Sequence, residues 1–331
     1  MNPLKLPVSI IVTMRNSATT IVTCLEGLAS QEYPIAEIIV FDNVSTDNSA
    51  ALVEEFATRS KVPVRLIKQT VDRGISNSYN SGAALAVAPL LILVHSDGGF
   101  PSAHELEKLT APLLDNPAVV ATYPKILMPF KVWDRFPFWQ KHLFARDLER
   151  ESPSMCGLFD CVRKDVYLTV GGFNVERFSE GCGYGGEDSD AHHRIAQLGR
   201  VEQSDAHVIH LHDLSNNYGL RKLFARRKLL ARTYGKILQF QGFQPVSGKL
   251  SFFVRPTLAI LPFVPHFFWA GLLLLFAFSF ANSWRMYMSK NTLLNPRILL
   301  LPFVDVALTY YETFWFIEGL LTPPADAKGS G

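Results

Sequence analysis

The sequence predicts an α/β fold with a mostly parallel sheet covered by helices on both faces, followed by an apolar helical region. Short apolar runs alternate with stretches in which apolar residues recur at helical spacing, as in βαβ units. Residues 90–94 are five consecutive apolar residues, which is typical of a strand buried on both faces. Residues 256–284 then contain no Lys, Arg, Asp or Glu, and 29 such residues are enough to cross a bilayer.

Four strands with intervening helices are expected in the N-terminal part. Each strand is a short apolar run, and each helix shows apolar residues three or four positions apart. The strands are expected at residues 8–12, 38–41, 64–67 and 90–94, and the helices at residues 17–28, 45–56 and 76–86. Such a doubly wound sheet binds its ligands beyond the carboxyl ends of the strands.

Polar residues stand where these strands end. Asp42 follows the second strand, Asp97 follows the fourth, and Arg15 and Asn16 lie in the loop after the first. Each of them, taken alone, fits an ordinary turn. Together they indicate a nucleotide pocket in which Asp97 holds a cation, Asp42 contacts a base or ribose, and Arg73 contacts phosphate. The absence of G-x-G-x-x-G and Walker lysine motifs argues against dinucleotide enzymes and P-loop NTPases.

A glycine-rich loop and a histidine pair follow later in the chain. Residues 181–186 include four glycines and precede Glu187 and Asp188, which open an expected helix. Acids are stabilised at helix N-termini without any ligand, so the sharper hypothesis is that Asp188 faces a ligand as a base. His210 and His212 end the last expected strand and share one side of it. Such a pair, taken alone, is more often a surface feature than a metal site.

The stretch between these motifs is less informative. A helix is expected at residues 103–114 and a strand at residues 119–123. Residues 128–139 are rich in Phe, Trp and Pro, which suits a mobile flap, a membrane-facing loop or ordinary packing. We favour packing, because large apolar side chains are usually buried.

In their order along residues 8–212, these motifs resemble glycosyltransferase family 2, whose catalytic domain has the GT-A fold. The matching stretches are residues 15–16, 42–47, 72–74, 95–97, 171–173 and 186–188, with Asn80. The resemblance implies a nucleotide-diphosphate-sugar donor, a divalent cation (Mn²⁺ or Mg²⁺) and an inverting reaction. It assigns Asp42 to the nucleobase or ribose, Asp97 to the metal and Asp188 to the catalytic base. Glu187 would orient Asp188 or contact an acceptor hydroxyl.

The resemblance also completes the candidate sites. The donor-binding set is Thr13, Arg15, Asn16, Asp42, Arg73, Asn80, Ser96 and Asp97. The metal set is Asp97, with His210 as the preferred further ligand and His212 behind it. The family's Asp-x-Asp motif usually has an acid where this chain has His95, which could bind the cation, contact a phosphate or only pack. Because of that substitution, a second function stays open: the chain could be a membrane protein that binds a sugar nucleotide and has no transferase activity.

Charge is unevenly spread, although the net charge is only +2. Residues 1–213 carry 19 Lys and Arg against 26 Asp and Glu, whereas residues 214–304 carry 12 bases and no acid. A basic stretch beside long apolar runs favours an anionic membrane surface over nucleic acid, so no nucleic-acid partner is expected. The four cysteines form no C-x-x-C pair, which favours a reduced, cytosolic catalytic domain at the cell membrane.

Two apolar segments predict attachment to a bilayer. The first is residues 256–284, and the second is residues 298–317, which contain Asp305 and Glu312. Acids at membrane depth usually face protein or water. We expect a hairpin of two membrane helices with both chain ends in the cytosol. The loop that connects the two helices contains Arg285, Lys290 and Arg297. In a spanning hairpin this loop would lie outside the cytosol, which disagrees with the positive-inside rule. A pair of re-entrant or shallowly inserted helices is therefore the alternative.

A basic helix is expected at residues 218–240, just before the apolar segments. It carries seven bases and no acid, which favours contact with anionic headgroups over a solvated face. Arg226 and Arg227 are the candidates for an acceptor phosphate, because arginine grips phosphate in bidentate fashion. The expected acceptor is polyprenyl phosphate, or a glycan on polyprenyl diphosphate, at the cytosolic face. The donor could be GDP-mannose or a UDP-hexose, and the sequence does not choose between them. Processive polymer synthesis is the less favoured alternative to transfer to a lipid-linked acceptor.

The expected organisation has four parts. They are a GT-A catalytic domain at residues 1–215, a basic amphipathic interface region at 216–255, two apolar membrane helices within 256–322 and a tail at 323–331.

Overall fold

The computed structural model describes residues 5–153, 155–176, 185–212, 218–241 and 251–322. The chain forms two compact units. Unit one comprises residues 1–129, 149–179 and 187–214, and unit two comprises residues 130–148, 180–186 and 215–331. The grouping of residues 130–148 with the C-terminal helices was not part of the predicted organisation, which placed them in the catalytic domain.

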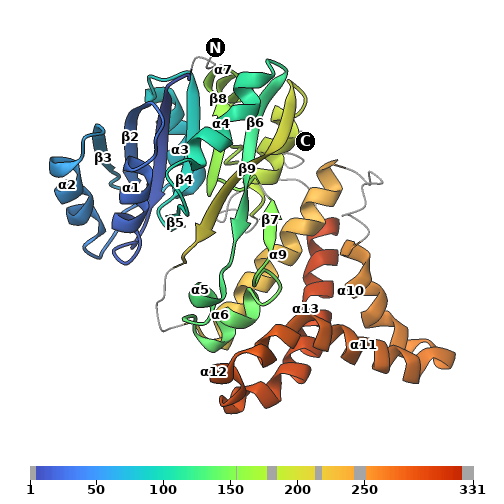
Figure 1. The fold of residues 1–331 in the computed structure, drawn as a ribbon. Coiled ribbons are helices and arrows are strands. Elements are labelled where there is room, and N and C mark those ends of the chain that lie inside the picture. The colour runs from blue at the N-terminus through green and yellow to red at the C-terminus, as the bar shows by residue number, and fades with distance from the viewer. Residues whose placement is uncertain (1–4, 154, 177–184, 213–217, 242–250, 323–331) are drawn as a thin grey trace. The chain divides into compact units, whose positions relative to one another are not determined.

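Unit one is built on a mixed sheet. Its strands are β1 Val8–Met14, β2 Ile35–Asp42, β3 Val64–Lys68, β4 Leu90–His95, β5 Gly98–Gly99, β6 Val119–Leu127, β7 Glu151–Pro153, β8 Phe159–Arg163 and β9 Arg200–His210. The strand order is β3-β2-β1-β4-β8-β6-β9-β5, with β7 paired to β6 (Figure 1). The first four strands are parallel, as are β6 and β9, whereas β8 runs antiparallel between β4 and β6. The predicted mostly parallel α/β sheet is thus confirmed.

Helices cover both faces of this sheet. They are α1 Ile21–Ala29, α2 Ser49–Arg59, α3 Gly74–Leu85, α4 Glu105–Asp115, α7 Lys164–Thr169 and α8 Glu187–Ile195. Ile10 and Val12 of β1 pack with residues of α1 and α4, whereas Ile11 packs with residues of α3 and α7. Successive strand residues point to opposite faces, so an uninterrupted apolar strand supplies both cores at once.

Unit two is helical. Its helices are α5 Phe130–Trp133, α6 Phe138–Leu143, α9 Leu220–Gln241, α10 Ser251–Ile260, α11 Phe268–Ser283, α12 Lys290–Leu293 and α13 Leu301–Leu321. Short 3-10 turns, η2 Leu261–Phe263, η3 Pro265–Phe267, η4 Trp284–Met288 and η5 Pro296–Leu300, connect them. Helices α9 and α13 lie side by side (Figure 1). Their backbones touch where Gly235 meets Phe316 and where Gly319 meets Arg232, and neither glycine leaves room for a Cβ.

The aromatic segment of residues 130–139 is packed inside unit two. Trp133 is fully buried, and its indole N–H donates to the backbone oxygen of Lys141 at 2.9 Å. Phe136, Phe138 and Trp139 are also buried. The favoured interpretation of this segment as packing is therefore confirmed, although the packing partner is unit two.

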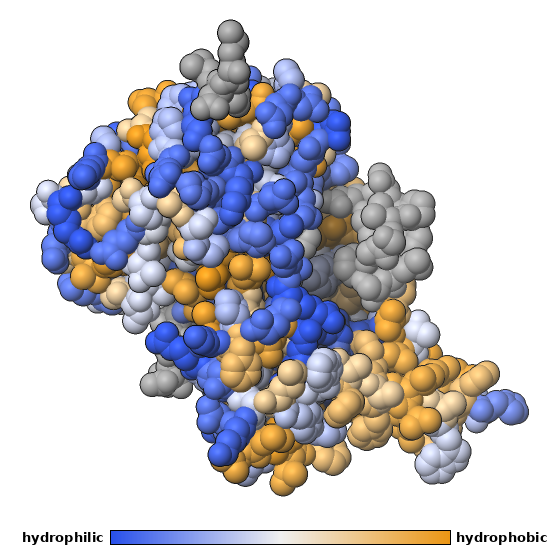
Figure 2. All heavy atoms as spheres, in the orientation of Figure 1, coloured by the Kyte–Doolittle hydropathy of each residue, from blue (hydrophilic) through white to orange (hydrophobic). Residues whose placement is uncertain are grey.

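Two stretches of unit two are long and apolar enough to cross a bilayer. They are Pro265–Met288 and Pro296–Leu321. Large apolar side chains on both are exposed in the protein, with Trp269 at 79% and Leu299 at 74%. Figure 2 shows apolar atoms gathered over these helices. Such a contiguous apolar surface marks a site of contact with a membrane or a partner.

Candidate active site

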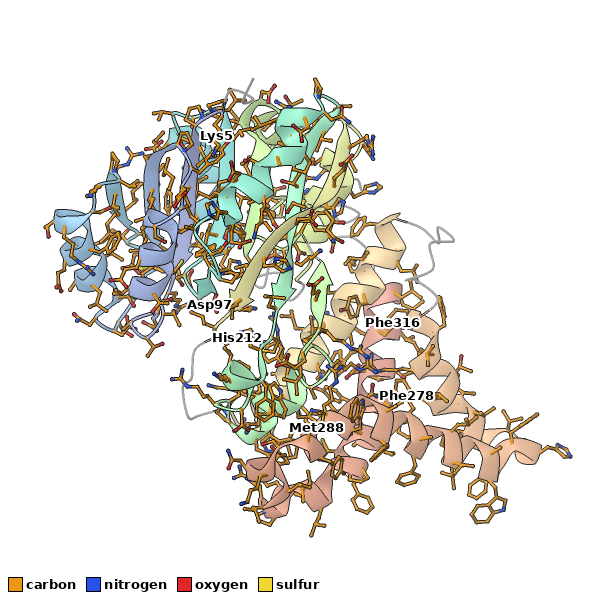
Figure 3. The ribbon with its side chains drawn as sticks, in the orientation of Figure 1. Lys5, Asp97, His212, Phe278, Met288 and Phe316 are labelled. Atoms are coloured by element: carbon orange, nitrogen blue, oxygen red, sulfur yellow. The ribbon has the colours of Figure 1, made fainter. Side chains whose placement is uncertain are left out.

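The carboxyl ends of β1, β2 and β4 meet at one edge of the sheet. Asp42 lies opposite the last residue of β1, and Thr13 lies opposite His95. Ser96 and Asp97 directly follow β4 (Figure 3). Polar residues from three neighbouring strands are therefore brought together at the edge where α/β sheets bind ligands.

Hydrogen bonds join the loop after β1 to the loop after β2. The Oδ1 atom of Asn16 accepts from the backbone N–H of Thr46 at 2.8 Å, and the N–H of Asn16 donates to Ser45 Oγ at 2.9 Å. Asp42 Oδ1 accepts the N–H of Ser45 at 3.0 Å. Asn16 has a φ of 50°, a left-handed conformation that asparagine adopts more readily than most residues. These contacts fix Asn16 and Asp42 before any donor binds.

The loop after β3 is tied to the same edge. Arg15 forms an ion pair with Asp72, which also accepts the N–H of Gly74 at 3.0 Å. Arg73 lies at the N-cap of α3 and is exposed. The basic side chain predicted to meet phosphate is thus accessible, while Arg15 is held by an acid.

Asn80 lies further along α3 and has a different set of contacts. Its Oδ1 accepts from the Tyr167 hydroxyl at 2.8 Å and from the N–H of Phe173 at 2.9 Å. Its Nδ2 donates to the backbone oxygen of Phe173 at 2.9 Å. The amide is therefore engaged in holding the turn after α7, a supporting contact that its predicted place in the donor-binding set did not anticipate.

The end of β9 delivers histidine to Asp97. Strand β5 pairs with β9, and the N–H of Leu211 donates to the backbone oxygen of Asp97 at 2.9 Å. His210 Nε2 then lies 3.1 Å from Asp97 Oδ2, and His212 Nδ1 lies 4.0 Å from the same oxygen. His95, Asp97 and His210 each offer a ligand atom, and these atoms lie within 4.8 Å of one another. The structure thus adds His95 to the predicted metal set.

The electrostatics of this cluster suit a cation. Burial raises the pKa of Asp97, but the charge and hydrogen bond of His210, with the charges of His95 and His212, hold it well below its ordinary range. An ionised carboxylate beside imidazole nitrogens can hold a divalent ion. Mn²⁺ fits this donor set better than Mg²⁺, which prefers oxygen ligands throughout.

A chain of contacts positions the His95 ring. The Tyr79 ring stacks on His95 with centroids 6.2 Å apart, and the Tyr79 hydroxyl donates to the backbone oxygen of Gly157 at 2.7 Å. Gly157 has a φ of 75°, and a Cβ there would lie 3.4 Å from His95 Nε2. Asp160 Oδ2 accepts the N–H of Gly157 at 2.5 Å. We did not single out Tyr79 or Asp160 from the sequence, although a carboxylate within an apolar strand was a usable signal.

Asp160 is a buried neighbour of the predicted base. Burial, followed by the negative charge of Asp188, raises the pKa of Asp160 well above its ordinary range. Its Oδ1 is buried and forms no hydrogen bond within the part of the chain that the structure describes. Both observations indicate a neutral carboxylic acid, because burial of an unpaired charge is costly. Asp188 lies in the first turn of α8 beside Glu187, and its Oδ1 accepts the N–H of Ser189 at 2.7 Å.

The glycines before α8 contact helix α9. The N–H of Gly185 donates to Thr233 Oγ1 at 2.7 Å. Gly186 has a φ of 99°, and a Cβ there would lie 2.8 Å from Thr233 Cγ2. Glycine is therefore required here for contact with α9. The predicted role, leaving room for a ligand, concerns mainly residues 181–184, which lie outside the described residues.

The predicted acceptor residues lie on α9 in unit two. Arg226 is exposed. Arg227 is mostly buried, and its Nε lies 3.7 Å from Glu312 Oε1. The two arginines are neighbours in the sequence, but one is exposed and the other is mostly buried beside an acid.

Residues 9–167 match the glycosyl transferase family 2 model. This stretch, just under half of the chain, is similar to glycosyltransferase family 2. The chain is 31% identical over 90 residues to glycosyltransferase GlyG of Streptococcus pneumoniae, which covers 27% of this chain and 30% of the relative. It is 24% identical over 170 residues to a PGL/p-HBAD biosynthesis glycosyltransferase of Mycobacterium tuberculosis. That match covers 50% of this chain and 63% of the relative. The chain thus spans less than two thirds of these relatives' length.

Solved structures of glycosyltransferases show that this chain has the GT-A fold. Mannosyltransferase PcManGT from Pyrobaculum calidifontis, in complex with GDP-Man and Mn²⁺, has a TM-score of 0.59 at 18% identity and covers 94% of this chain and 88% of its own. GalNAc-T7 with UDP, GalNAc and Mn²⁺ has a TM-score of 0.53 at 14% identity. The match covers 78% of this chain and 51% of the GalNAc-T7 chain. The predicted resemblance to the family and the predicted GT-A fold are confirmed.

The neutral state of Asp160 can be tested by the pH dependence of stability. The raised pKa means that the folded protein keeps a proton that the unfolded chain releases above about pH 4. This contribution is present in acid and is lost as the pH rises through the folded pKa. Asp160→Asn lacks the proton equilibrium, so its melting temperature relative to wild type should increase between pH 5 and pH 8.

The matched control is Asp165→Asn, which removes an exposed acid from nearby α7. Its melting temperature relative to wild type should stay level over the same range. A difference for Asp160→Asn that does not change with pH would show that Asp160 is ionised in the folded protein.

Proposed function

We propose that this family 2 glycosyltransferase moves a sugar, with inversion, from a nucleotide-diphosphate sugar to a lipid-linked acceptor at the cytosolic face of the cell membrane. The observation that carries the proposal is the cluster of His95, Asp97 and His210 at the end of β4. The complexes of PcManGT with GDP-Man and of GalNAc-T7 with UDP support GDP-mannose or a UDP-hexose as donor.

The donor is held at the carboxyl edge of the sheet. Asp42, fixed by Ser45, contacts the nucleobase or ribose. Thr13, Asn16 and Ser96 shape the same edge, and exposed Arg73 contacts phosphate. Asp97 and His210, with His95 and His212 beside them, would hold Mn²⁺ or Mg²⁺. That ion, when bound, neutralises charge on the leaving diphosphate.

Asp188 is the base in this proposal. It takes the proton from the acceptor hydroxyl as the oxygen attacks the anomeric carbon from the face opposite the diphosphate. The bond between the anomeric carbon and the phosphate oxygen breaks, its electron pair leaves with the diphosphate, and Arg73 stabilises that charge. Glu187, in the same helical turn, orients Asp188 or contacts an acceptor hydroxyl. An acceptor phosphate is already ionised and needs no strong base.

A binding protein without transferase activity is the second candidate. The observation in its favour is His95, which replaces an acid of the family's usual motif. This argument is weakened by the position of His95, which lies in one cluster with Asp97 and His210. The enzyme is therefore our preferred function.

Unit two would attach the enzyme to lipid from one side. Residues 130–148 leave unit one after Pro129 and rejoin it at Glu149, whose N–H donates to the backbone oxygen of Met128 at 2.9 Å. The segment therefore starts and ends at one place on unit one. Asp134 is five residues from Pro129, and five extended residues reach at most about 18 Å.

This segment contacts the loop between the two apolar stretches. Asp134 accepts hydrogen bonds from Ser289 Oγ at 2.6 Å and from Asn291 Nδ2 at 2.9 Å. Arg285 donates to the backbone oxygens of Arg146 and Leu148. The hydrocarbon core of a bilayer is about 30 Å thick, which is more than the segment can reach. We therefore expect the loop on the same side of the membrane as unit one.

The second apolar helix is paired with a charged one. Arg232 of α9 forms an ion pair with Glu318 of α13 at 2.6 Å, and Lys228 lies 3.6 Å from the Trp315 ring centroid. A basic residue at the centre of a bilayer costs about 2.5–3.5 kcal/mol, so α9, with its seven bases, favours the interface. We therefore propose shallow insertion of these helices instead of the spanning hairpin first expected.

Asp97 should control nucleotide binding through the metal. Asp97→Asn removes the charge without changing volume, so stabilisation by GDP or UDP with Mn²⁺ should weaken at least about tenfold in apparent affinity. Thermal shift with and without Mn²⁺ measures this effect. Asp205→Asn, which changes an exposed acid on β9, should bind as wild type. Unchanged metal dependence in Asp97→Asn would remove Asp97 from the metal site.

The base is tested by separating binding from transfer. Asp188→Asn should retain donor affinity and lose transfer to a polyprenyl phosphate-linked glycan by about 10²–10⁴-fold. Glu187→Gln should lose less if it only orients Asp188. Wild-type protein that binds donor and transfers to no acceptor would favour the binding protein, whereas absence of nucleotide binding would favour a membrane scaffold.

Shallow insertion is tested with single cysteines in the connecting loop. Lys290→Cys and Arg297→Cys are exposed positions between the two apolar stretches. A membrane-impermeant maleimide should label them above the parental background only after cells are permeabilised, as it should label Lys61→Cys in unit one. Labelling of the loop from outside intact cells would establish a spanning hairpin and refute shallow insertion.

A further inference from the structure

Three arginines of unit two converge on one carboxylate and one aromatic ring. Arg227 of α9 lies 3.7 Å from Glu312 Oε1, and Arg255 of α10 lies 3.0 Å from Glu312 Oε2. Arg146, which follows α6, and Arg255 lie over the Phe278 ring, with guanidinium carbons 5.8 and 5.7 Å from its centroid. Phe278 belongs to the first apolar stretch (Figure 3).

The cluster contains more positive than negative charge. Glu312 is shared by Arg227 and Arg255, while Arg146 forms no ion pair within the described part of the chain. Partial burial of its guanidinium and the positive charges of Arg255 and Arg227 lower the pKa of Arg146 to about 10. Asp305, another acid of α13, lies 2.7 Å from His142 Nε2 and is engaged there.

Two features of the cluster suit the binding of an anion. Arg146 and Arg255 lie on the same ring, where like charges repel unless an anion approaches both. The Nε atom of Arg227 is buried and forms no hydrogen bond with any residue that the structure describes. An oxyanion would accept that donor and bridge the guanidinium groups in the planar, bidentate manner that arginine favours for phosphate.

We propose that Arg146, Arg227 and Arg255 bind the phosphate of the lipid-linked acceptor, with Phe278 beside it on the apolar helix. The inference rests on the proposed function and names the acceptor site for it. The site keeps Arg227 of the two residues predicted from the basic helix and adds two that lie far away in the sequence. Exposed Arg226 is not among these contacts.

The lipid character of the ligand follows from the surroundings. Leu274 on the same helix as Phe278 is 48% exposed, and Phe263 in the turn after α10 is 74% exposed. An anion site that includes a residue of an apolar helix with exposed side chains suits a phosphate that carries a hydrocarbon chain. A bulk phospholipid headgroup offers the same chemistry as polyprenyl phosphate, so the experiment must separate the two.

The test measures lipid binding to the purified full chain in detergent. The probes are a short-chain polyprenyl phosphate, the corresponding polyprenol and phosphatidylglycerol. Wild type should bind the polyprenyl phosphate, and Arg146→Ala and Arg227→Ala should each bind it at least about tenfold more weakly, as expected when a hydrogen bond to a charged group is lost. Arg221→Ala, an exposed base on the same helix, should bind as wild type. The polyprenol should bind weakly to all variants.

The stabilisation of each variant by GDP or UDP with Mn²⁺ is measured in parallel. Normal nucleotide binding with weakened lipid binding in Arg146→Ala supports the site and shows that the variant is folded. Equal lipid binding by wild type and both variants overturns the site while leaving the proposed function intact. Equal competition by phosphatidylglycerol overturns the assignment to the acceptor. Loss of nucleotide binding in wild type would instead refute the proposed function.

Discussion

The structure depends on one constraint: a carboxylate and two imidazoles must be held together at the end of a fully apolar strand. The buried run of β4 fixes Asp97 at the sheet edge, because neither face of the strand can turn toward water. The two-residue pairing of β5 with β9 then brings His210 to it from more than one hundred positions away. Tyr79 and Gly157 hold His95 from the other side, and Asp160 holds Gly157.

The parts of the fold that depend on local pattern could be predicted from sequence. The parallel strands β1 to β4 follow from apolar runs, and Asp42 and Asp97 follow from their ends. His210 was identified because a histidine at a strand end fits a known family arrangement. His95 was left with three possible roles, cation binding, phosphate contact or packing, because its partners are distant in sequence. The strand at β8 was expected from its apolar residues, but its antiparallel direction was not, since a strand's direction depends on its neighbours and not on its own residues.

Unit two shows more clearly what sequence could not supply. Asp305 and Glu312 looked misplaced in the expected apolar segment. In the structure they and Glu318, the third acid of α13, each form an ion pair with a His or Arg from another element. Their partners are His142, Arg232 and Arg255. No pattern in the sequence relates these three positions to α13. Packing of the aromatic segment was predicted, but its partner was not, because long-range contacts decide which core a buried tryptophan joins.

The contact of Gly185 and Gly186 with Thr233 has a mechanical consequence. These glycines belong to the contacts of α9, and the next peptide unit begins the helix that carries Asp188. One peptide bond therefore separates the residue that contacts α9 from the residue where α8 begins. Gly186 cannot be replaced by a bulkier residue without displacing Thr233 or losing this contact. Without that contact, the residue that precedes α8 would no longer be fixed to α9.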